Sequence, residues 1–231
     1  MSDHPLLFDY TFKFDNGRIL HFPILLDPVD LVLLNFEMEI EAEWAKLENH
    51  QCKNCTLKSD AYPYCPIAKN LVNILSEFND VFSYEQVDVI VKTNERTYSK
   101  NCGVQKGLGA MLGIYMVSSG CPIMSKLKPM VRFHLPFASV QETVSRSVGS
   151  YLLGQYFNHK AGKKADWDLA GLKQSYKEIQ TVNHAMAGRL RSISAKDANV
   201  NALIILDIFA REVPDTIDAS LNQLKYLYEE N

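Results

Sequence analysis

The chain has 231 residues, of which 47% are apolar and 22% are charged, and its formal net charge at pH 7 is −3. Such a composition can bury a substantial core, which excludes intrinsic disorder, and the charge balance gives no electrostatic reason to expect nucleic-acid binding. The five cysteines are odd in number and clustered, which argues against the disulfide framework of a secreted protein.

No segment has the pattern of a targeting or membrane-spanning sequence. Residues 1–5 have neither the basic start nor the apolar core of a signal peptide. The uncharged run 107–125 approaches the length of a membrane span, but it contains four glycines, three serines and Pro122, which favours a buried helix. We therefore expect a cytoplasmic protein with no membrane partner.

The N-terminal part of the chain alternates apolar and polar residues as β-strands do. Residues 8–14 and 19–26 are separated by Asp15-Asn16-Gly17, a strong hairpin turn. Residues 31–44 and 87–98 predict two further strands, the second of them added antiparallel to the same sheet. The first of these two carries glutamates at positions 37, 39, 41 and 43, which we interpret as a solvated strand face more readily than as a carboxylate ligand surface.

Beyond residue 103 the long patterns are helical. Ser139-x-x-Glu142 is a capping box that begins one helix, and Gly162 lies just past its end. Pro214 is expected to separate the last two helices.

The most regular helix is predicted from about Asp168, because its apolar residues advance by three or four positions at every step. They are Leu169, Leu172, Tyr176, Ile179, Val182, Met186, Leu190 and Ile193. Arg189 and Arg191 are assigned to the polar side of this helix and are expected at the surface.

Because the predicted strands come first in the chain and the helices follow, we expect an α+β fold with a small antiparallel sheet and a helical C-terminal half. Residues 1–102 would hold the sheet, a cysteine loop and one helix, and residues 103–231 the helical region, packed together as one domain. A cysteine-rich, metal-binding loop is expected to join the two parts.

Four cysteines carry the most specific chemistry in the chain: Cys52-x-x-Cys55, then Cys65-Pro66, then Cys121-Pro122. Thiolates at such spacing hold a metal or an iron–sulfur cluster. Proline is favoured at the first position of a helix, so each Cys-Pro step places a thiol before a helix, whose dipole favours the thiolate. The helix start after Cys65 is better supported by the sequence than the helix start after Cys121.

Several ligand sets remain open. A single Cys-x-x-Cys knuckle with two isolated cysteines favours an iron–sulfur cluster over a structural zinc ion, and zinc over unliganded thiols. His50 or Cys102 could replace Cys121 as the fourth ligand, and Cys102 and Cys121 could instead be small buried apolar residues.

A basic segment follows Cys121. Lys128, Arg132 and His134 lie among aromatic residues and prolines and could hold an anionic ligand beside a metal centre. The competing interpretation is a solvated basic edge. No phosphate-binding loop, dinucleotide fingerprint or nucleophile elbow occurs in the sequence.

The cysteine and basic motifs together resemble an uncharacterised bacterial family known only as a domain of unknown function. The resemblance rests on the Cys-x-x-Cys, Cys-Pro, Ser119-Gly-Cys-Pro and Arg132-Phe-His-Leu-Pro-Phe137 motifs and extends over nearly the whole chain. It implies a bacterial cytoplasmic protein whose framework includes Cys52, Cys55, Cys65 and Cys121, and it implies no activity.

Two classes of function follow. The first is a metal- or cluster-binding sensor or protein-interaction module, whose partner would be another protein. The second is a metal- or cluster-dependent enzyme that acts on an anionic small molecule near Arg132 and His134. A structural zinc protein is a further alternative. We favour the first class, and the sequence leaves the oligomeric state open.

Overall fold

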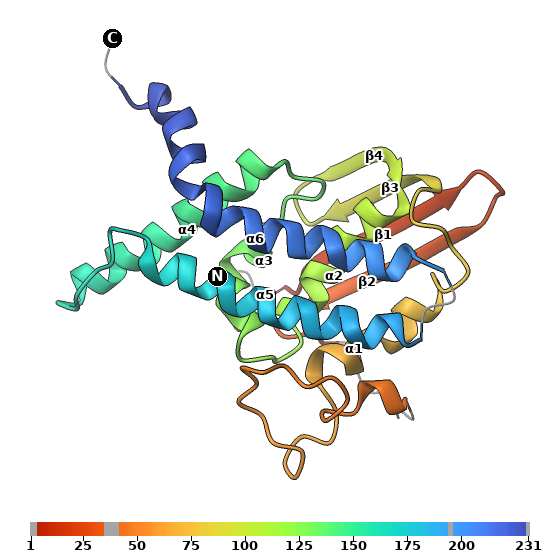
Figure 1. Ribbon diagram of the computed structural model, residues 1–231. Coiled ribbons are helices and arrows are strands. Elements are labelled where there is room, and N and C mark those ends of the chain that lie inside the picture. Colours follow the sequence, from red (N-terminus) through yellow and green to blue (C-terminus); the bar gives the residue numbers. More distant parts are fainter. Residues whose placement is uncertain (1–3, 35–41, 194–195, 230–231) are drawn as a thin grey trace.

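The structure is a computed structural model that describes residues 4–34, 42–193 and 196–229, without the side chains of 209, 211–216, 218 and 220. Four strands form one antiparallel sheet in the order β2-β1-β3-β4 (Figure 1). They are β1 Leu6–Phe14, β2 Ile19–Leu26, β3 Gln86–Thr93 and β4 Thr97–Gly103. Helices make up the rest of the C-terminal half, so the predicted α+β class is confirmed.

The predicted hairpin is present. Tyr10 of β1 lies opposite Phe22 of β2, and Gly17 in the turn has φ +86°, a left-handed conformation that glycine adopts without strain. The predicted strand 87–98 is in fact β3, a turn and the start of β4. The sequence did not predict β4, because this edge strand is mostly polar and exposed and depends on main-chain pairing with β3.

The strand predicted at residues 31–44 is not continuous. Leu33 forms an isolated bridge with Leu26, and a short 3-10 helix occupies Glu43–Ala45. Residues 35–41, which include Glu37, Glu39 and Glu41, lie outside the described residues, so the predicted glutamate face stays untested.

Six α-helices are described: α1 Pro66–Ser76, α2 Val104–Val117, α3 Lys128–Arg132, α4 Val140–Lys160, α5 Ala170–Arg191 and α6 Ala198–Leu224. Ser139 and Glu142 form the predicted capping box, and Gly162 follows α4 with φ +71°. The predicted break at Pro214 is wrong, since α6 continues through it. A proline inside a helix removes one helical hydrogen bond, and it can kink the helix without ending it.

Helix α2 lies between the sheet and the outer helices, and its glycines allow its backbone to pack closely against both. A Cβ on Gly107 would lie 2.7 Å from Val89 and 2.8 Å from Phe12, two buried residues of the sheet. On the α6 side, a Cβ on Gly109 would lie 3.0 Å from the carbonyl oxygen of Ala202. The three layers are therefore the sheet, α2 and the outer helices.

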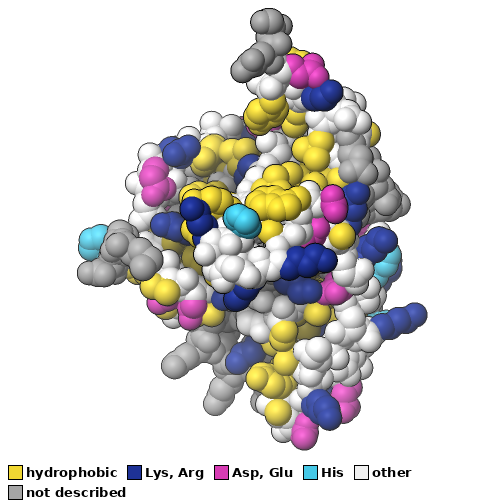
Figure 2. Space-filling view, turned by 90° about the vertical axis from the view of Figure 1, so that its left-hand side faces the viewer, with side chains coloured by type: hydrophobic (Ala, Val, Ile, Leu, Met, Phe, Trp, Pro, Cys, Tyr) yellow, Lys and Arg dark blue, Asp and Glu magenta, His cyan; other side chains and the backbone are white. Residues whose placement is uncertain are grey.

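Helices α5 and α6 run side by side across the outside of this layer, with α4 beside them (Figure 1). The seven residues of the predicted α5 stripe from Leu169 to Leu190 are all buried, and Ile193 packs partly against the core, as the spacing predicted. Figure 2 turns the left-hand side of Figure 1 to the viewer, where hydrophobic side chains gather with basic ones among them.

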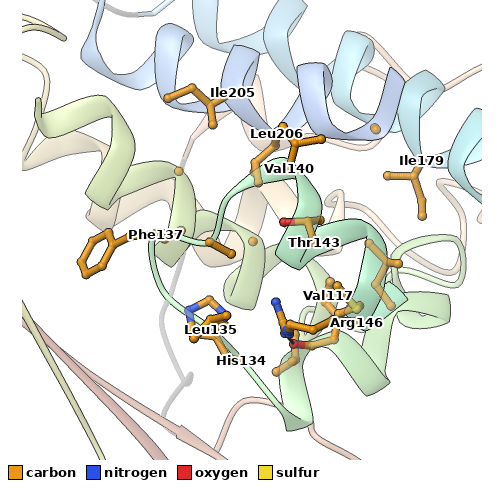
Figure 3. Close-up of a pocket in the computed structure, with 18 of the residues that line it drawn as sticks. Val117, His134, Leu135, Phe137, Val140, Thr143, Arg146, Ile179, Ile205 and Leu206 are labelled. Carbon is orange, nitrogen blue, oxygen red and sulfur yellow. Dashed lines mark hydrogen bonds between the residues drawn. The ribbon is translucent and has the colours of Figure 1, made fainter. Parts of the chain in front are cut away.

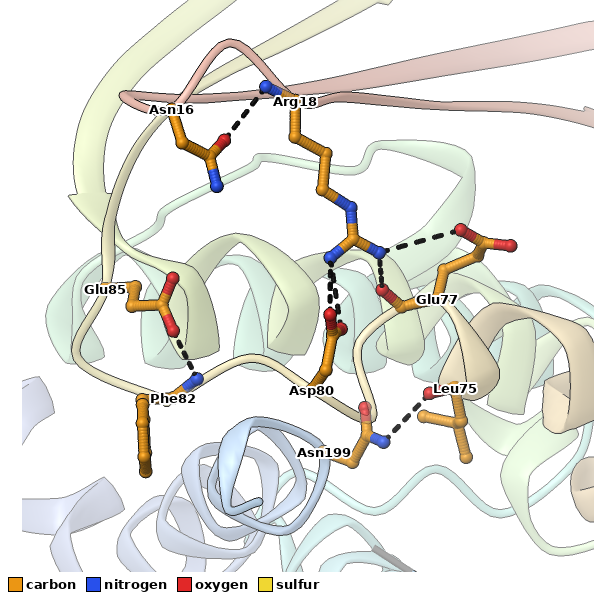
Figure 4. A network of polar contacts seen from close by, with 8 residues as sticks. All are labelled: Asn16, Arg18, Leu75, Glu77, Asp80, Phe82, Glu85 and Asn199. Atoms are coloured by element: carbon orange, nitrogen blue, oxygen red, sulfur yellow. Dashed lines mark hydrogen bonds and ion pairs between the residues drawn. The ribbon is translucent and has the colours of Figure 1, made fainter. Parts of the chain in front are cut away.

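A polar network ties the first hairpin to the loop after α1 (Figure 4). Arg18 donates a 3.0 Å hydrogen bond to Asp80 and a 2.5 Å bond to the carbonyl of Glu77. Nearby, Asn199 at the start of α6 donates to the carbonyl of Leu75 at 3.0 Å. These contacts connect the sheet, α1 and α6.

The buried apolar side chains of the sheet, the cysteine segment and the helices belong to a single cluster. Within the described ranges, no helix is both long enough and apolar enough to cross a membrane.

Candidate functional site

The cysteine segment is a long loop between β2 and α1, shown in orange below α1 in Figure 1. Main-chain contacts close its base, where Lys46 bridges Tyr64 and the amide of Cys65 donates to the carbonyl of Ala45 at 2.8 Å. This loop lies inside the N-terminal half. It does not join the sheet to the helices as predicted, because β4 leads directly into α2.

Three separate segments supply the four predicted cysteines. Cys52 and Cys55 lie in the loop, joined by a 2.9 Å bond from the amide of Cys55 to the carbonyl of Cys52. Cys65 is the N-cap of α1 with Pro66 at its first position, as predicted. After Cys121 the predicted helix is only a turn and a 3-10 helix, Met124–Leu127.

The thiols of these segments act on one another electrostatically. Burial, together with the neighbouring thiols of Cys65, Cys121 and Cys55, raises the pKa of the Cys52 thiol to about 12. Burial also raises the pKa of the Cys121 thiol, whereas hydrogen bonds from the main-chain N–H groups of Met124 and Ile123 lower it. The structure therefore brings Cys52, Cys55, Cys65 and Cys121 into one neighbourhood.

Arg189 of α5 lies at the base of this neighbourhood and is 1% exposed. Its guanidinium donates to the carbonyls of Trp44 at 2.7 Å, Lys46 at 2.6 Å and Leu47 at 2.9 Å. Burial lowers the pKa of Arg189, whereas the thiols of Cys65, Cys52 and Cys55 act to raise it. The prediction that Arg189 lies at the surface is wrong, whereas Arg191 is exposed as predicted.

The sequence contained a signal for this position. Arg189 follows Val182 by seven residues and Met186 by three, which is the spacing of the buried stripe. Because arginine is usually exposed, its residue type favoured a surface position for Arg189. A guanidinium can nevertheless be buried where main-chain carbonyls accept its hydrogen bonds.

The four thiols do not have the arrangement of ligands around a metal ion. In the part of the chain that the structure describes, no group of three or more His, Cys, Asp or Glu side chains could hold a metal ion as placed. The described structure therefore does not show the predicted cysteine-rich metal-binding loop.

Of the two alternative fourth ligands, Cys102 lies in the sheet and His50 lies two residues before Cys52. Cys102 is buried in β4 opposite Val87, and Lys106 and Lys100, not the other cysteines, are the charges that act on its thiol. His50 is exposed, and its ring lies against Gly188 of α5, where a Cβ would meet the ring at 3.0 Å.

A second feature is a cavity of about 450 Å³ between α2, α4, α5, α6 and the segment around His134 (Figure 3). Of the predicted anion-binding residues, His134 lines this cavity. Lys128 is half-buried and Arg132 is exposed, and neither is among its described lining residues. The structure does not bring these three side chains together around the cavity.

The His134 imidazole pairs with Tyr10 of the sheet, at 2.7 Å between Nε2 and the phenol oxygen. Burial, with the nearby charge of Arg146, lowers the pKa of His134 to about 3, so the ring is neutral at physiological pH. Burial raises the pKa of Tyr10, which keeps its hydroxyl protonated. If the phenol donates to Nε2, the proton of the ring lies on Nδ1.

Comparison with known proteins identifies a family and no activity. Residues 8–229 match the model of a family described as a domain of unknown function (DUF6901), which confirms the resemblance drawn from the motifs. No curated protein and no solved structure matches the chain.

Proposed function

The chain belongs to the DUF6901 family, whose function is unknown, and we propose that it binds a metal centre through Cys52, Cys55, Cys65 and Cys121. The observation that carries this proposal is the electrostatic neighbourhood of four thiols from three separate segments. Crowded thiols repel one another as thiolates, which raises their pKa values. A bound cation offsets that repulsion and displaces the protons.

The donor set fits such a centre in kind and number. Four cysteines are the usual ligands of structural zinc and of iron–sulfur clusters. Both centres carry net negative charge with four thiolates, and the buried guanidinium of Arg189 offers a compensating positive charge. Binding would require the thiols to turn toward a common point, because they are not arranged around one as placed.

We favour an iron–sulfur cluster over zinc, because the ligands are one Cys-x-x-Cys knuckle and two isolated cysteines that each precede proline. The centre would join the cysteine loop, the start of α1 and the turn after α2. Loss or oxidation of the centre would then free the loop, which suits a sensor or a module that binds another protein.

An enzyme that acts on an anionic molecule beside the metal has less support. None of the four cysteines is among the described residues that line the cavity, and the exposed Arg132 is not among them either. A thiolate centre without an open ligand position has a structural or electron-storing role.

The test is metal and acid-labile sulfide analysis, with an absorption spectrum, on protein purified without oxygen. We expect bound iron and sulfide in the wild type and their loss in Cys121→Ala. Cys102→Ala is the matched control, because it removes a buried thiol outside the neighbourhood. If the analysis finds zinc and no iron or sulfide, the centre is a structural zinc ion and not a cluster. Absence of any metal, or equal loss in both variants, would overturn the proposal.

A further inference from the structure

The cavity beside α4 has the general properties of a small-molecule site. Its volume of about 450 Å³ falls within the range of ligand pockets, roughly 300–1,000 Å³. Aliphatic side chains from α2, α3, α4, α5, α6 and the loop after α3 form most of its wall, among them Val117, Val140, Ile179 and Leu206 (Figure 3). No acidic side chain is among the described residues that line it.

Arg146 of α4 supplies a positive charge to this wall. Its Nη2 donates to the carbonyls of Met130 at 2.8 Å and Phe133 at 2.5 Å, which holds the guanidinium in place. Nε and Nη1 have no hydrogen-bond partner among the residues that the structure describes. An arginine held in this way can present its remaining N–H groups to a carboxylate.

The charge of Glu142 acts on Arg146, but the two side chains form no direct ion pair in the described structure. Glu142 lies one turn earlier on α4, and its Oε2 accepts hydrogen bonds from the amide and the hydroxyl of Ser139 at 2.7 and 2.9 Å. No ion pair joins Arg146 to a carboxylate within the described ranges. Beside Arg146 lies the neutral imidazole of His134 (Figure 3), which adds no competing negative charge.

Asn183 of α5 provides a second, independent indication of a ligand. This residue lines the cavity, is 2% exposed, and its Oδ1 has no hydrogen-bond partner in the described structure. Buried acceptors without a partner are uncommon, because desolvation without a hydrogen bond is unfavourable. The oxygen is enclosed as placed, and a hydroxyl on a bound molecule would satisfy it once the Asn183 side chain turns toward the cavity.

We propose that the cavity binds a hydroxylated, medium-chain carboxylic acid. The carboxylate would pair with Arg146, the hydrocarbon chain would lie against the aliphatic wall, and the hydroxyl would donate to Oδ1 of Asn183. This site is separate from the proposed metal centre, and its occupancy does not depend on it.

The test is calorimetric titration of the full chain with decanoate, its monohydroxy derivatives and 1-decanol. The alcohol matches the chain length but lacks the charge, so decanoate should bind at least about tenfold more tightly, as the loss of a charged hydrogen bond implies. This comparison needs no substitution. Equal binding of decanoate and 1-decanol, or no binding of any carboxylate, would overturn the proposal.

Two variants locate the site. Arg146→Gln should weaken decanoate binding by about tenfold or more, whereas the exposed Arg132→Gln should leave it unchanged. At least one hydroxydecanoate should bind the wild type more tightly than decanoate, and Asn183→Leu should abolish that preference. Equal effects of the two arginine variants would contradict the assigned site, and absence of any hydroxyl preference would contradict the role of Asn183. Thermal denaturation of each variant confirms that it is folded.

Discussion

The side-chain amide of Asn54 donates a 3.0 Å hydrogen bond to the main-chain carbonyl of Glu178 in α5. Asn54 lies inside the Cys-x-x-Cys knuckle, while the carboxylate of Glu178 forms an ion pair with Lys126, which follows Cys121 in sequence. Glu178 therefore contacts both the cysteine loop and the segment after α2. Helix α5 thus holds together two of the segments that carry the thiols.

Replacing Asn54 with alanine should loosen the cysteine loop. We expect the free energy of unfolding to fall by about 0.5–1.5 kcal/mol, the usual contribution of one hydrogen bond. In metal-loaded protein, a chelator should also remove the metal faster. Lys53→Ala is the control, because this adjacent side chain is exposed. Urea denaturation and chelator kinetics measure the two effects, and equal behaviour of the two variants would contradict the role of the contact.

Replacing Arg189 with methionine should be severely destabilising. Three carbonyls of the cysteine segment would lose their donor inside the protein, and we expect a loss of about 3 kcal/mol or more. Arg191→Met changes the same residue type on the same helix at an exposed position, and it should shift stability by no more than about 0.5 kcal/mol. Urea midpoints at neutral pH distinguish the variants, and similar midpoints would show that Arg189 does not hold the loop base.

Replacing Gly107 with alanine should force α2 away from the sheet. The added Cβ would overlap the stiff side chain of Val89 and the buried ring of Phe12, which should cost about 1–3 kcal/mol. Gly149→Ala in α4 meets no atom within 4 Å and should instead stabilise the helix by about 0.5–1 kcal/mol. Thermal denaturation should show a lower melting temperature for Gly107→Ala and a higher one for Gly149→Ala. A stabilised Gly107→Ala variant would contradict the close packing of α2 on the sheet.

The half-buried imidazole of His134, whose pKa desolvation lowers, should make stability depend on pH. Its pKa is about 3 in the folded protein and about 6.5 in an unfolded chain, so between these values the unfolded chain binds more protons. Stability should therefore fall as pH decreases from 6.5 toward 3, with this residue adding a slope of at most about 1.4 kcal/mol per pH unit.

His134→Gln isolates this contribution, because the glutamine oxygen can still accept the hydroxyl of Tyr10 but does not titrate. Urea denaturation of the variant and the wild type between pH 7 and pH 4 should show a smaller slope for the variant. Identical slopes would mean that the imidazole is not held neutral by burial.

Local signals in the sequence predicted much of the fold. Asp15-Asn16-Gly17, the Ser139 capping box and the α5 stripe each depend on residues a few positions apart, and each is present as predicted. Predictions failed where distant contacts outweighed local preference. Strand pairing forms β4 from a polar sequence, and main-chain carbonyls of a distant segment accept the hydrogen bonds of the buried Arg189.

The amino-acid sequence by itself determined which residues could form a thiolate site, because metal-binding chemistry depends on residue type and on short spacings such as Cys52-x-x-Cys55. Only the tertiary structure decided that Cys121 lies beside them, that Arg189 is buried beneath the loop, and that Arg146 and Asn183 line one cavity with His134. These relationships depend on how α2, α4 and α5 pack together, and no local spacing in the chain encodes contacts between residues so far apart.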